Sequence, residues 1–488
     1  MAYYKLKEGL RLRGWDRLPW AVVDGRSGMA HFLKTRTEME ALQVCNGRID
    51  VDLPLLGSDV RALVPRLVEA GVVEPCAPGD FILPEQEYRK YPNRYIRTAH
   101  WSVTGRCNLR CRHCYMSAPD AKYGELGHDE VMAIADALGD AGIAQVALTG
   151  GEPLVRKDFL DIVDRLLAHG MVIVQIYSNG MAVDEKLLKA LDNRGIHPEF
   201  NMSYDAPGWH DWLRGVDGAE KAVDRAFLLC REMGFPTGAE MCLHEGNEDL
   251  LRDAVNHLSE VGCSSLKTNP ISDVGAWHEG GYGRSIATTD LFETYLDYIP
   301  AYYEDGMPLS LMLGGFFSAK PTKPDTWDIP VYRFPRDPER CCVCEHARNV
   351  MYISPEGRLL PCMSISGTDI QEEFPLVGEA GLAQCLTDSR YLDFIDTRAH
   401  TLLAHNPECG TCAFAPWCQG GCRAAGLEDS GQTDLLARDE ATCQLYRDGW
   451  IMRLIRLMRE LRPEAACLAT ADKELMVALE DAQAQTRA

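Results

Sequence analysis

The distribution of cysteine constrains this chain more than any other feature of its sequence. The 488 residues include 19 cysteines, and most of them crowd into two stretches, 107–114 and 341–443. In a reducing compartment, cysteines clustered in this way are more often metal ligands than disulfide partners. We therefore expect the chain to bind metal in two places. The clustered cysteines are Cys107, Cys111, Cys114, Cys341, Cys342, Cys344, Cys362, Cys409, Cys412, Cys418, Cys422 and Cys443.

The bulk composition predicts a soluble, cytoplasmic protein. Apolar residues make up 46% of the chain and charged residues 25%, as in globular domains. The first residues lack the apolar segment of a signal peptide, and no stretch is long and apolar enough to span a membrane. The formal net charge of −22 argues against binding to nucleic acid or to anionic membrane surfaces, because both need clustered Lys and Arg.

The first 95 residues have the order of elements of a small winged helix. Short strand-like runs come first, two helical stretches with apolar residues at helical spacing follow, and a short strand closes the region. A polar segment, Tyr88–Tyr95, reads as a linker. The strand-like runs are 21–23 and 31–33, the helical stretches are about 35–46 and 58–70, and the closing strand is 72–75.

From residue 98 onward, strands and helices alternate. Six such β/α repeats predict a parallel sheet, curved into a partial (β/α)6 barrel of the TIM type, with ligands at the carboxyl ends of the strands. The α/β fold is thus expected to carry a small domain at each end. The expected regions are a winged helix at 1–95, the barrel at 96–310, a connector at 311–340, a cysteine-rich domain at 341–445, and a helix with a tail at 446–488.

The first cysteine run is Cys107-x3-Cys111-x2-Cys114, in a loop after a predicted strand. Thiolates are natural ligands of iron–sulfur clusters, and three of them leave one iron of a four-iron cubane open to a small molecule. The alternative is a structural zinc site closed by His113, but such sites usually use four ligands in spaced pairs.

This run resembles the CxxxCxxC signature of the radical SAM superfamily, and later stretches match further motifs in order. Gly150-Gly151-Glu152-Pro153 is similar to the GGE motif, Ser178-Asn179-Gly180 to the TNG turn, and the segment 203–214 to SLDGP…HD..R, with Tyr204 and Ala206 departing from that pattern. The resemblance implies a [4Fe-4S] cluster that cleaves S-adenosylmethionine to a 5′-deoxyadenosyl radical. It implies catalytic cluster ligands at Cys107, Cys111 and Cys114, and S-adenosylmethionine contacts at Tyr115, Gly150, Gly151, Glu152, Ser178, Ser203 and Arg214.

The second cysteine array resembles the SPASM extension of radical SAM enzymes, which implies two auxiliary [4Fe-4S] clusters and so three clusters in all. A zinc ribbon is the alternative. By this resemblance, one auxiliary cluster uses Cys344, Cys362, Cys422 and an upstream cysteine, Cys341 in preference to Cys342. The other uses Cys409, Cys412, Cys418 and Cys443.

Residues 1–95 resemble, in layout, the PqqD-like element that captures the leader of a precursor peptide by strand addition. DNA binding is the alternative for a winged helix, but the helix 58–69 has two arginines against two acidic residues. The whole order resembles maturases of ribosomally made peptides. It implies an oxidative crosslink, first of all a cysteine thioether as in sactipeptides and ranthipeptides, with a flavodoxin or ferredoxin as electron donor.

Other products and classes stay open. Carbon–carbon or carbon–oxygen crosslinks are alternative products. Another alternative is a protein or cofactor maturase similar to anaerobic sulfatase maturases or PqqE. A non-enzymatic electron carrier would leave the motif residues Glu152 and Arg214 unexplained. The base that would deprotonate the substrate is not identified. Glu240, Lys267 and Asp273 are candidates because they lie near strand ends.

Overall fold

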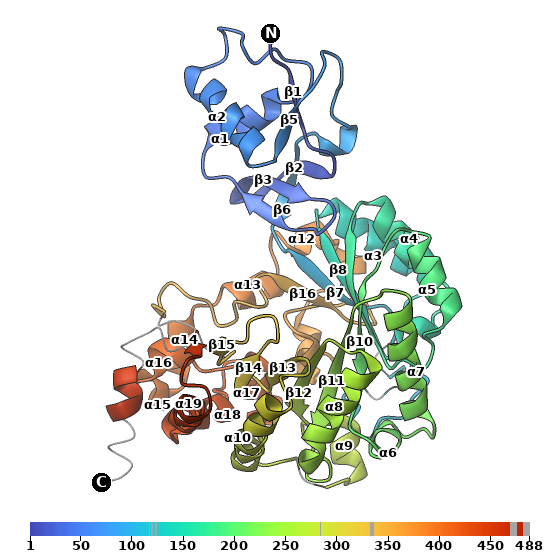
Figure 1. Ribbon diagram of the computed structural model, residues 1–488, viewed down its shortest axis with the longest axis vertical. Coiled ribbons are helices and arrows are strands. Elements are labelled where there is room, and N and C mark those ends of the chain that lie inside the picture. Colours follow the sequence, from blue (N-terminus) through green and yellow to red (C-terminus); the bar gives the residue numbers. More distant parts are fainter. Residues whose placement is uncertain are drawn as a thin grey trace.

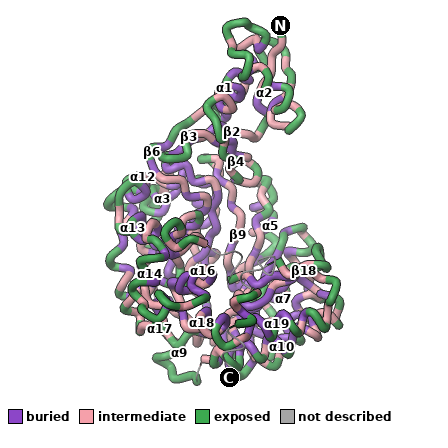
Figure 2. The backbone as a smooth tube through the Cα atoms, turned by 90° about the vertical axis from the view of Figure 1, so that its left-hand side faces the viewer, coloured by how far each residue is buried: buried purple, intermediate pink, exposed green. Residues whose placement is uncertain are grey.

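The computed structural model describes residues 1–116, 118, 121–122, 124–283, 285–331, 336–468 and 476–481. Residues 1–94 project from one end of the molecule, and the C-terminal cysteine-rich region packs beside the barrel strands (Figure 1). The front region has its own apolar core, which includes Leu12, Leu42 and Val64, whereas the barrel and the C-terminal region share a single core. Figure 2 shows buried residues both in the front region and in the larger body.

The front region contains the expected helices and strand-like runs and three further strands. Helix α1 begins after Thr35, whose hydroxyl accepts a hydrogen bond from the Glu38 backbone N–H while the Glu38 carboxylate accepts from the Thr35 N–H, a complete capping box. The four-stranded sheet has the order β4-β3-β2-β6, and β1 pairs with β5. The elements are β1 (Tyr4–Leu6), β2 (Leu10–Asp16), β3 (Leu18–Asp24), β4 (Ala30–Phe32), α1 (Arg36–Val44), α2 (Ser58–Glu69), β5 (Val73–Pro75) and β6 (Arg89–Arg94).

The segment expected to be a polar linker is strand β6, which corrects that prediction. Its polar residues alternate with Tyr91 and Asn93, and both of these are buried. Tyr91 stacks on Trp15 with ring centroids 5.6 Å apart, and Arg94 forms a two-pronged ion pair with Asp396 at 2.6 and 2.7 Å. Half-buried alternation of this kind belongs to a strand, and the partners that reveal it lie far away in the sequence.

The barrel follows the predicted alternation. Strands β7 to β13 pair in parallel, each with the next along the chain. The strands are β7 (Thr98–Ser102), β8 (Gln145–Thr149), β9 (Val172–Ser178), β10 (Glu199–Ser203), β11 (Thr237–Leu243), β12 (Ser265–Pro270) and β13 (Ser310–Leu313). The helices are α3 (His128–Asp140), α4 (Phe159–Ala168), α5 (Glu185–Asp192), α6 (His210–Arg214), α7 (Ala219–Glu232), α8 (Leu251–Val261), α9 (Gly275–Gly280) and α10 (Thr288–Glu304).

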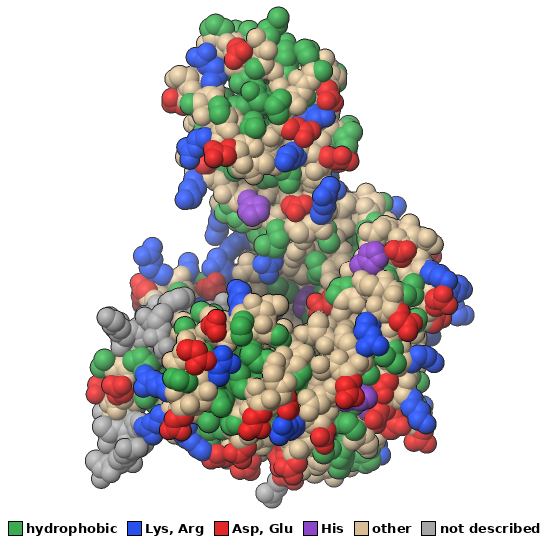
Figure 3. Space-filling view, in the orientation of Figure 1, with side chains coloured by type: hydrophobic (Ala, Val, Ile, Leu, Met, Phe, Trp, Pro, Cys, Tyr) green, Lys and Arg blue, Asp and Glu red, His purple; other side chains and the backbone are tan. Residues whose placement is uncertain are grey.

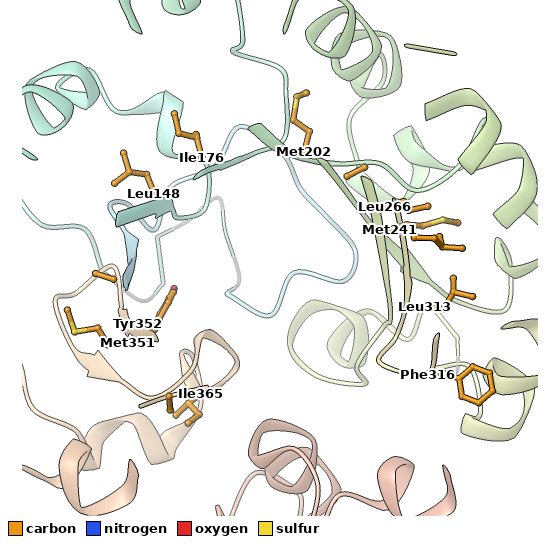
Figure 4. Packing of buried hydrophobic residues seen from close by; sticks show 14 of the residues in the cluster. Leu148, Ile176, Met202, Met241, Leu266, Leu313, Phe316, Met351, Tyr352 and Ile365 are labelled. Atoms are coloured by element: carbon orange, nitrogen blue, oxygen red, sulfur yellow. The ribbon is translucent and has the colours of Figure 1, made fainter. Parts of the chain in front are cut away.

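Apolar side chains on one face of these strands pack against the surrounding helices. Met202, Met241, Leu266 and Leu313 are among those drawn in Figure 4, and each is at most 1% exposed. Successive residues of a strand point to opposite faces of the sheet. On each strand, the residues that alternate with these buried apolar residues therefore face the lumen of the barrel.

The sheet extends beyond the expected barrel at both edges. Residues 311–340, expected as a connector, supply the rest of β13 and the antiparallel strands β14 (Phe317–Ala319) and β15 (Thr326–Asp328). From the cysteine-rich region, β16 (Val350–Ile353) pairs in parallel with β7, and β17 (Leu359–Leu360) pairs with β16. The second cysteine region is thereby hydrogen-bonded to the strand that leads into the first cysteine loop.

Short helices make up most of the cysteine-rich region. The final long helix, expected within 446–488, lies on α10: Trp450 contacts Phe292 and Arg453 pairs with Glu293. In the described part of the chain no helix is long and apolar enough to cross a bilayer. The elements are α11 (Val377–Ala380), α12 (Leu382–Cys385), α13 (Arg390–Asp396), α14 (Ala399–His405), α15 (Pro407–Gly410), α16 (Ala415–Cys418), α17 (Arg423–Asp429), α18 (Glu440–Arg447), α19 (Trp450–Leu461) and β18 (Ala466–Cys467).

Candidate functional site

The first cysteine loop leaves the carboxyl end of β7 and is held by backbone hydrogen bonds from the turn after β8. Gly151 N–H donates to the Thr104 carbonyl and Glu152 N–H to the Arg106 carbonyl, both at 2.8 Å. A Cβ atom on Gly151 would lie 2.3 Å from the Arg106 carbonyl oxygen. Gly151 therefore permits the close approach of the cysteine loop.

Two further segments brace the same loop. Arg110 and Arg112 donate backbone hydrogen bonds to the carbonyls of Arg214 and Leu213, at the end of α6. Next to them, a Cβ on Gly215 would lie 2.3 Å from the Arg110 carbonyl oxygen, and the backbone at Gly215 has φ 68°, which favours glycine. At the other end of the loop, the Ala276 N–H donates to the Cys114 carbonyl. The positions of the three cysteines are thus set by backbone on three sides.

Glu152 is completely buried, and three hydrogen bonds orient its carboxylate. The Ser178 hydroxyl and the Leu154 N–H donate to one oxygen at 3.0 and 3.1 Å, and the Asn179 N–H donates to the other at 2.7 Å. Burial nevertheless raises the pKa of Glu152 to about 7, against an ordinary value of 4.5. Ser178 therefore acts on Glu152 from the end of β9, and the buried carboxylate is suited to pair with an ammonium group.

The raised pKa of Glu152 predicts a pH-dependent stability. The folded protein binds more protons at Glu152 than the unfolded chain does between pH 4.5 and 7, so the free energy of unfolding should fall across this window as pH rises. The contribution is about 3 kcal/mol. The difference in melting temperature between the metal-free wild-type protein and Glu152→Gln should decrease from pH 5 to pH 8. Glu260→Gln, on the exposed face of α8, is the control; a difference independent of pH would contradict the prediction.

Arg214 connects the cysteine loop to a buried carboxylate. Its guanidinium donates to both oxygens of Asp205 at 2.7 and 3.0 Å, and its third nitrogen lies 3.9 Å from the Cys111 sulfur and 3.4 Å from His113 Nε2. The ion pair holds the pKa of Asp205 below its ordinary value. Burial and then the nearby guanidinium lower the pKa of His113 to about 3. His113, the alternative fourth ligand of a zinc site, thus faces Arg214.

The remaining predicted contacts lie around the loop. Tyr115 follows Cys114, and its backbone packs so closely on Gly275 that a Cβ there would lie 2.9 Å from the Tyr115 Cα. Ser203 ends β10 and is half-buried. Ala206 is buried in a left-handed conformation, φ 82°, where glycine is favoured. Ala206 takes the place of the glycine in the SLDGP pattern and keeps the left-handed turn, at the cost of backbone strain.

The three thiols fit the predicted iron–sulfur cluster by their chemistry and spacing. Burial raises the pKa of the Cys107 thiol to about 12, and the nearness of Cys111 and Cys114 contributes in the same direction. The Asn179 side-chain amide donates toward the Cys107 sulfur at 3.8 Å, and the Leu109 N–H donates at 3.4 Å. Such donors stabilise thiolates that ligate clusters. Glu152 and Arg214 lie close to this loop, since Glu152 acts on the pKa of Cys107 and Arg214 lies 3.9 Å from the Cys111 sulfur.

The cysteines of the second region form two groups. Cys409, Cys412, Cys418 and Cys443 all line one cavity between α15, α16 and α18, with Arg438 and Arg447 also at its wall. Burial raises the pKa of Cys418 to about 12. The structure thus brings together the four residues that the family resemblance implied for one auxiliary cluster.

Cys344, Cys362 and Cys422 form the other group. Burial raises the pKa of the Cys344 and Cys422 thiols. The charge of Cys422 raises the pKa of Cys344 further, and the charge of Cys362 raises that of Cys422. Cys342 lies elsewhere: its sulfur is 3.4 Å from Arg398 and 3.8 Å from the Asp396 carbonyl. Within the described ranges, no three His, Cys, Asp or Glu side chains form a group that could hold a single metal ion.

Sequence reasoning missed several residues that organise the site. Asn247 donates to the carbonyls of Asp205 and Cys242 and so ties the β10 turn to β11. Asp205 also contacts His210 at 3.1 Å. A signal for Gly215 was present, because glycine directly after a helix end often takes a positive φ. The contacts of Asn247 and Cys242 depend on strand neighbours and have no local signal.

Comparisons with known proteins agree with this geometry. The Radical SAM superfamily model matches residues 101–258. Fe-coproporphyrin III synthase of Methanosarcina barkeri is 31% identical over 186 residues, 36% of this chain and 45% of that protein. PqqA peptide cyclase of Granulibacter bethesdensis is 26% identical over 336 residues, 68% of this chain and 84% of that protein. The chain therefore spans less than half of the first relative and most of the second.

Among solved structures, SuiB of Streptococcus suis bound to its precursor peptide SuiA is similar in fold, with a TM-score of 0.60 and 14% identity over 91% of this chain and all of that chain. The segment matched to the superfamily starts on β7 and contains the cysteine loop, the Glu152 turn and Arg214. The superfamily implies a [4Fe-4S] cluster and S-adenosylmethionine, and the site residues fit both. Residues 101–258 are therefore a radical SAM domain.

Proposed function

We propose that this chain is a maturase that installs an oxidative crosslink, first of all a cysteine thioether, in a ribosomally made precursor peptide. The observation that carries the proposal is the pairing of a radical SAM site with two separate cysteine groups in one body, one of them lining a cavity. When bound at Cys107, Cys111 and Cys114, the cluster would supply the electron that cleaves S-adenosylmethionine to a 5′-deoxyadenosyl radical.

The two cysteine groups support an oxidative outcome. A substrate radical that forms a new bond to sulfur, carbon or oxygen must lose one electron, and an iron–sulfur cluster is suited to accept it. In the SPASM-type assignment, Cys409, Cys412, Cys418 and Cys443 hold one auxiliary cluster. Cys344, Cys362 and Cys422 hold the other with Cys341, since the sulfur of Cys342 is directed to Arg398. A flavodoxin or ferredoxin would reduce the cluster held by Cys107, Cys111 and Cys114.

A peptide substrate is supported by the comparisons and by the front region, which we assign to the PqqD-like, winged-helix class. Relatives are named PqqA peptide cyclase and sporulation killing factor maturation protein SkfB, and SuiB has been solved with a precursor peptide. Among the residues that the structure describes, half of the exposed large hydrophobic side chains lie in the first 95 residues. Figure 3 shows hydrophobic side chains on the surface of this region. Exposed apolar groups that gather in one region mark a surface for binding another chain. They are Met1, Leu18, Met29, Phe32, Leu53, Leu55, Phe81 and Leu83.

Strand β4 offers the edge on which a leader peptide can pair. It is the last strand of its sheet, and its partner on the other side is β3. Leu33 donates its N–H inward to the Trp20 carbonyl, and Asp24 donates to the Met29 carbonyl. In an antiparallel pair the intervening residues, Ala30 and Phe32, then direct their N–H and C=O groups outward. A peptide added as a strand would bind these groups.

The leader-binding proposal predicts that Ala30→Pro weakens processing of the full precursor at least about tenfold, because proline removes an outward-facing donor from the strand edge. The probe is the peptide encoded beside this gene, labelled for fluorescence anisotropy and assayed for crosslinking under anaerobic conditions. Ala77→Pro, in an exposed loop of the same region, is the matched control. Unchanged affinity in Ala30→Pro would exclude β4 as the leader site.

A second candidate product is a carbon–carbon crosslink. The specific support is the alignment with PqqA peptide cyclase, which covers 84% of that protein. Either product removes two hydrogen atoms from the peptide, so mass alone does not separate them. Alkylation by iodoacetamide does: a thioether consumes the cysteine thiol, whereas a carbon–carbon bond leaves it reactive.

A further inference from the structure

Four residues form a row across neighbouring strands of the barrel. Ser203 on β10 is in register with Glu240 on β11, Glu240 with Lys267 on β12, and Lys267 with Met312 on β13. Residues in register on parallel strands lie at the same level and point to the same face. Ser203 is also the residue assigned to S-adenosylmethionine by the family motif, so the row begins at the radical site.

This row faces the lumen side of the barrel sheet. The flanking residues Ala239 and Met241 are at most 2% exposed and belong to the core against the helices. Met241 is drawn in Figure 4, and Glu240, which lies between the two residues in the strand, points to the opposite face. Lys267 is exposed and Met312 is 37% exposed, although both lie on interior strands of the sheet. Solvent therefore reaches the lumen side of the sheet at these two positions.

Glu240 lies close to residues that interact with each of the two cysteine regions. Burial raises the pKa of the Cys242 thiol to about 12, the charges of Asp205 and then Glu240 act in the same direction, and Cys242 also lies near Cys111 and Arg214. On the next strand, the charge of Lys267 acts on Cys362, which belongs to the second cysteine region. A side chain placed over Glu240 therefore has the radical site on one side and an electron acceptor site on the other.

Other acidic groups near the site are occupied. Glu152 accepts three hydrogen bonds, Asp205 is held by Arg214, and Asp273 is exposed and pairs with His278 at 3.4 Å. By contrast, within the part of the chain that the structure describes, no hydrogen bond or ion pair engages the Glu240 carboxylate. Of the three residues considered from the sequence, Glu240 alone combines a carboxylate with a place in the lumen.

We infer that Glu240 is the catalytic base that accepts the proton of the substrate nucleophile as the crosslink closes. The inference rests on the proposed function. As the substrate carbon radical couples to the thiol, the S–C bond forms and the S–H bond breaks. The proton passes to the Glu240 carboxylate, and the one remaining electron passes to an acceptor of the iron–sulfur class. The peptide is oxidised by one electron in this step and the acceptor is reduced.

The test compares wild-type holoenzyme with Glu240→Gln, using the peptide encoded beside this gene, made with perdeuterated residues in the core segment. Glu240→Gln should still cleave S-adenosylmethionine and transfer deuterium to 5′-deoxyadenosine within about twofold of wild type, while crosslinked product falls at least about 100-fold. Peptide affinity by anisotropy and iron content should not change. Glu199→Gln, the same substitution on the lumen face of β10 four residues before Ser203, is the matched control and should keep full product.

The outcomes separate this inference from the proposed function. If wild-type enzyme transfers no deuterium from the peptide, the proposed function itself fails. If wild type forms product and Glu240→Gln forms it at an unchanged rate, Glu240 is not the base. Loss of deuterium transfer, peptide affinity and product together in Glu240→Gln would show a structural or positioning role and would also overturn the assignment.

Discussion

Replacing Cys107, Cys111 or Cys114 by alanine is expected to reduce formation of 5′-deoxyadenosine by at least about a thousandfold. Each single substitution should cost nearly as much as all three together, because the three ligands act as a unit. The loop is braced by backbone hydrogen bonds from the Glu152 turn and from Leu213 and Arg214, so its fold does not depend on any one thiol. The measurement is anaerobic incubation of the reconstituted protein with S-adenosylmethionine and dithionite.

Iron analysis and a matched cysteine variant control this experiment. The variants should lose about four iron atoms per chain. Cys76→Ala, in the front region outside both cysteine groups, should keep the iron content and the activity of wild type. A triad variant that still produces 5′-deoxyadenosine at the wild-type rate would show that this loop does not hold the catalytic cluster.

Replacing Cys418 or Cys443 by alanine is expected to reduce formation of the crosslinked peptide while leaving cleavage of S-adenosylmethionine intact. Both cysteines line the cavity between α15, α16 and α18, away from the first loop, so cleavage of S-adenosylmethionine should continue. The crosslinked peptide should fall at least about 100-fold, because the electron released on bond formation would lose its acceptor, and about four iron atoms per chain should be lost.

Stability must be measured alongside, since a bound cluster can supply part of the folding free energy of a segment rich in short helices. Cys418 lies on α16 and Cys443 on α18. An effect that both variants share therefore reports loss of the cluster, whereas an effect of only one variant reports damage to that helix. Full product from either variant, with unchanged melting temperature and iron content, would exclude a cluster in this cavity.

Elements that were predicted correctly are those whose sequence pattern lies within a short segment of the chain. Helix α2 was predicted because its apolar residues recur at helical spacing within a few residues of each other. The barrel strands and helices were found from their alternation in the same way. Strand β6 was taken for a linker because the Tyr91 stack on Trp15 and the ion pair between Arg94 and Asp396 join residues that are far apart in the chain.

By itself the sequence predicted a radical SAM domain, which the family match over residues 101–258 supports, and it proposed the residues that would ligate metal. Motifs such as Cys107-x3-Cys111-x2-Cys114 keep their chemistry in a fixed local spacing, and the β/α alternation implied the end of the barrel at which they would meet. The tertiary structure decided how these parts combine. It placed β16 beside β7, gathered Cys409, Cys412, Cys418 and Cys443 at one cavity, and put Glu240 in register with Ser203. The physical reason is that strand pairing, register and burial are set by contacts between distant segments, which no local pattern contains.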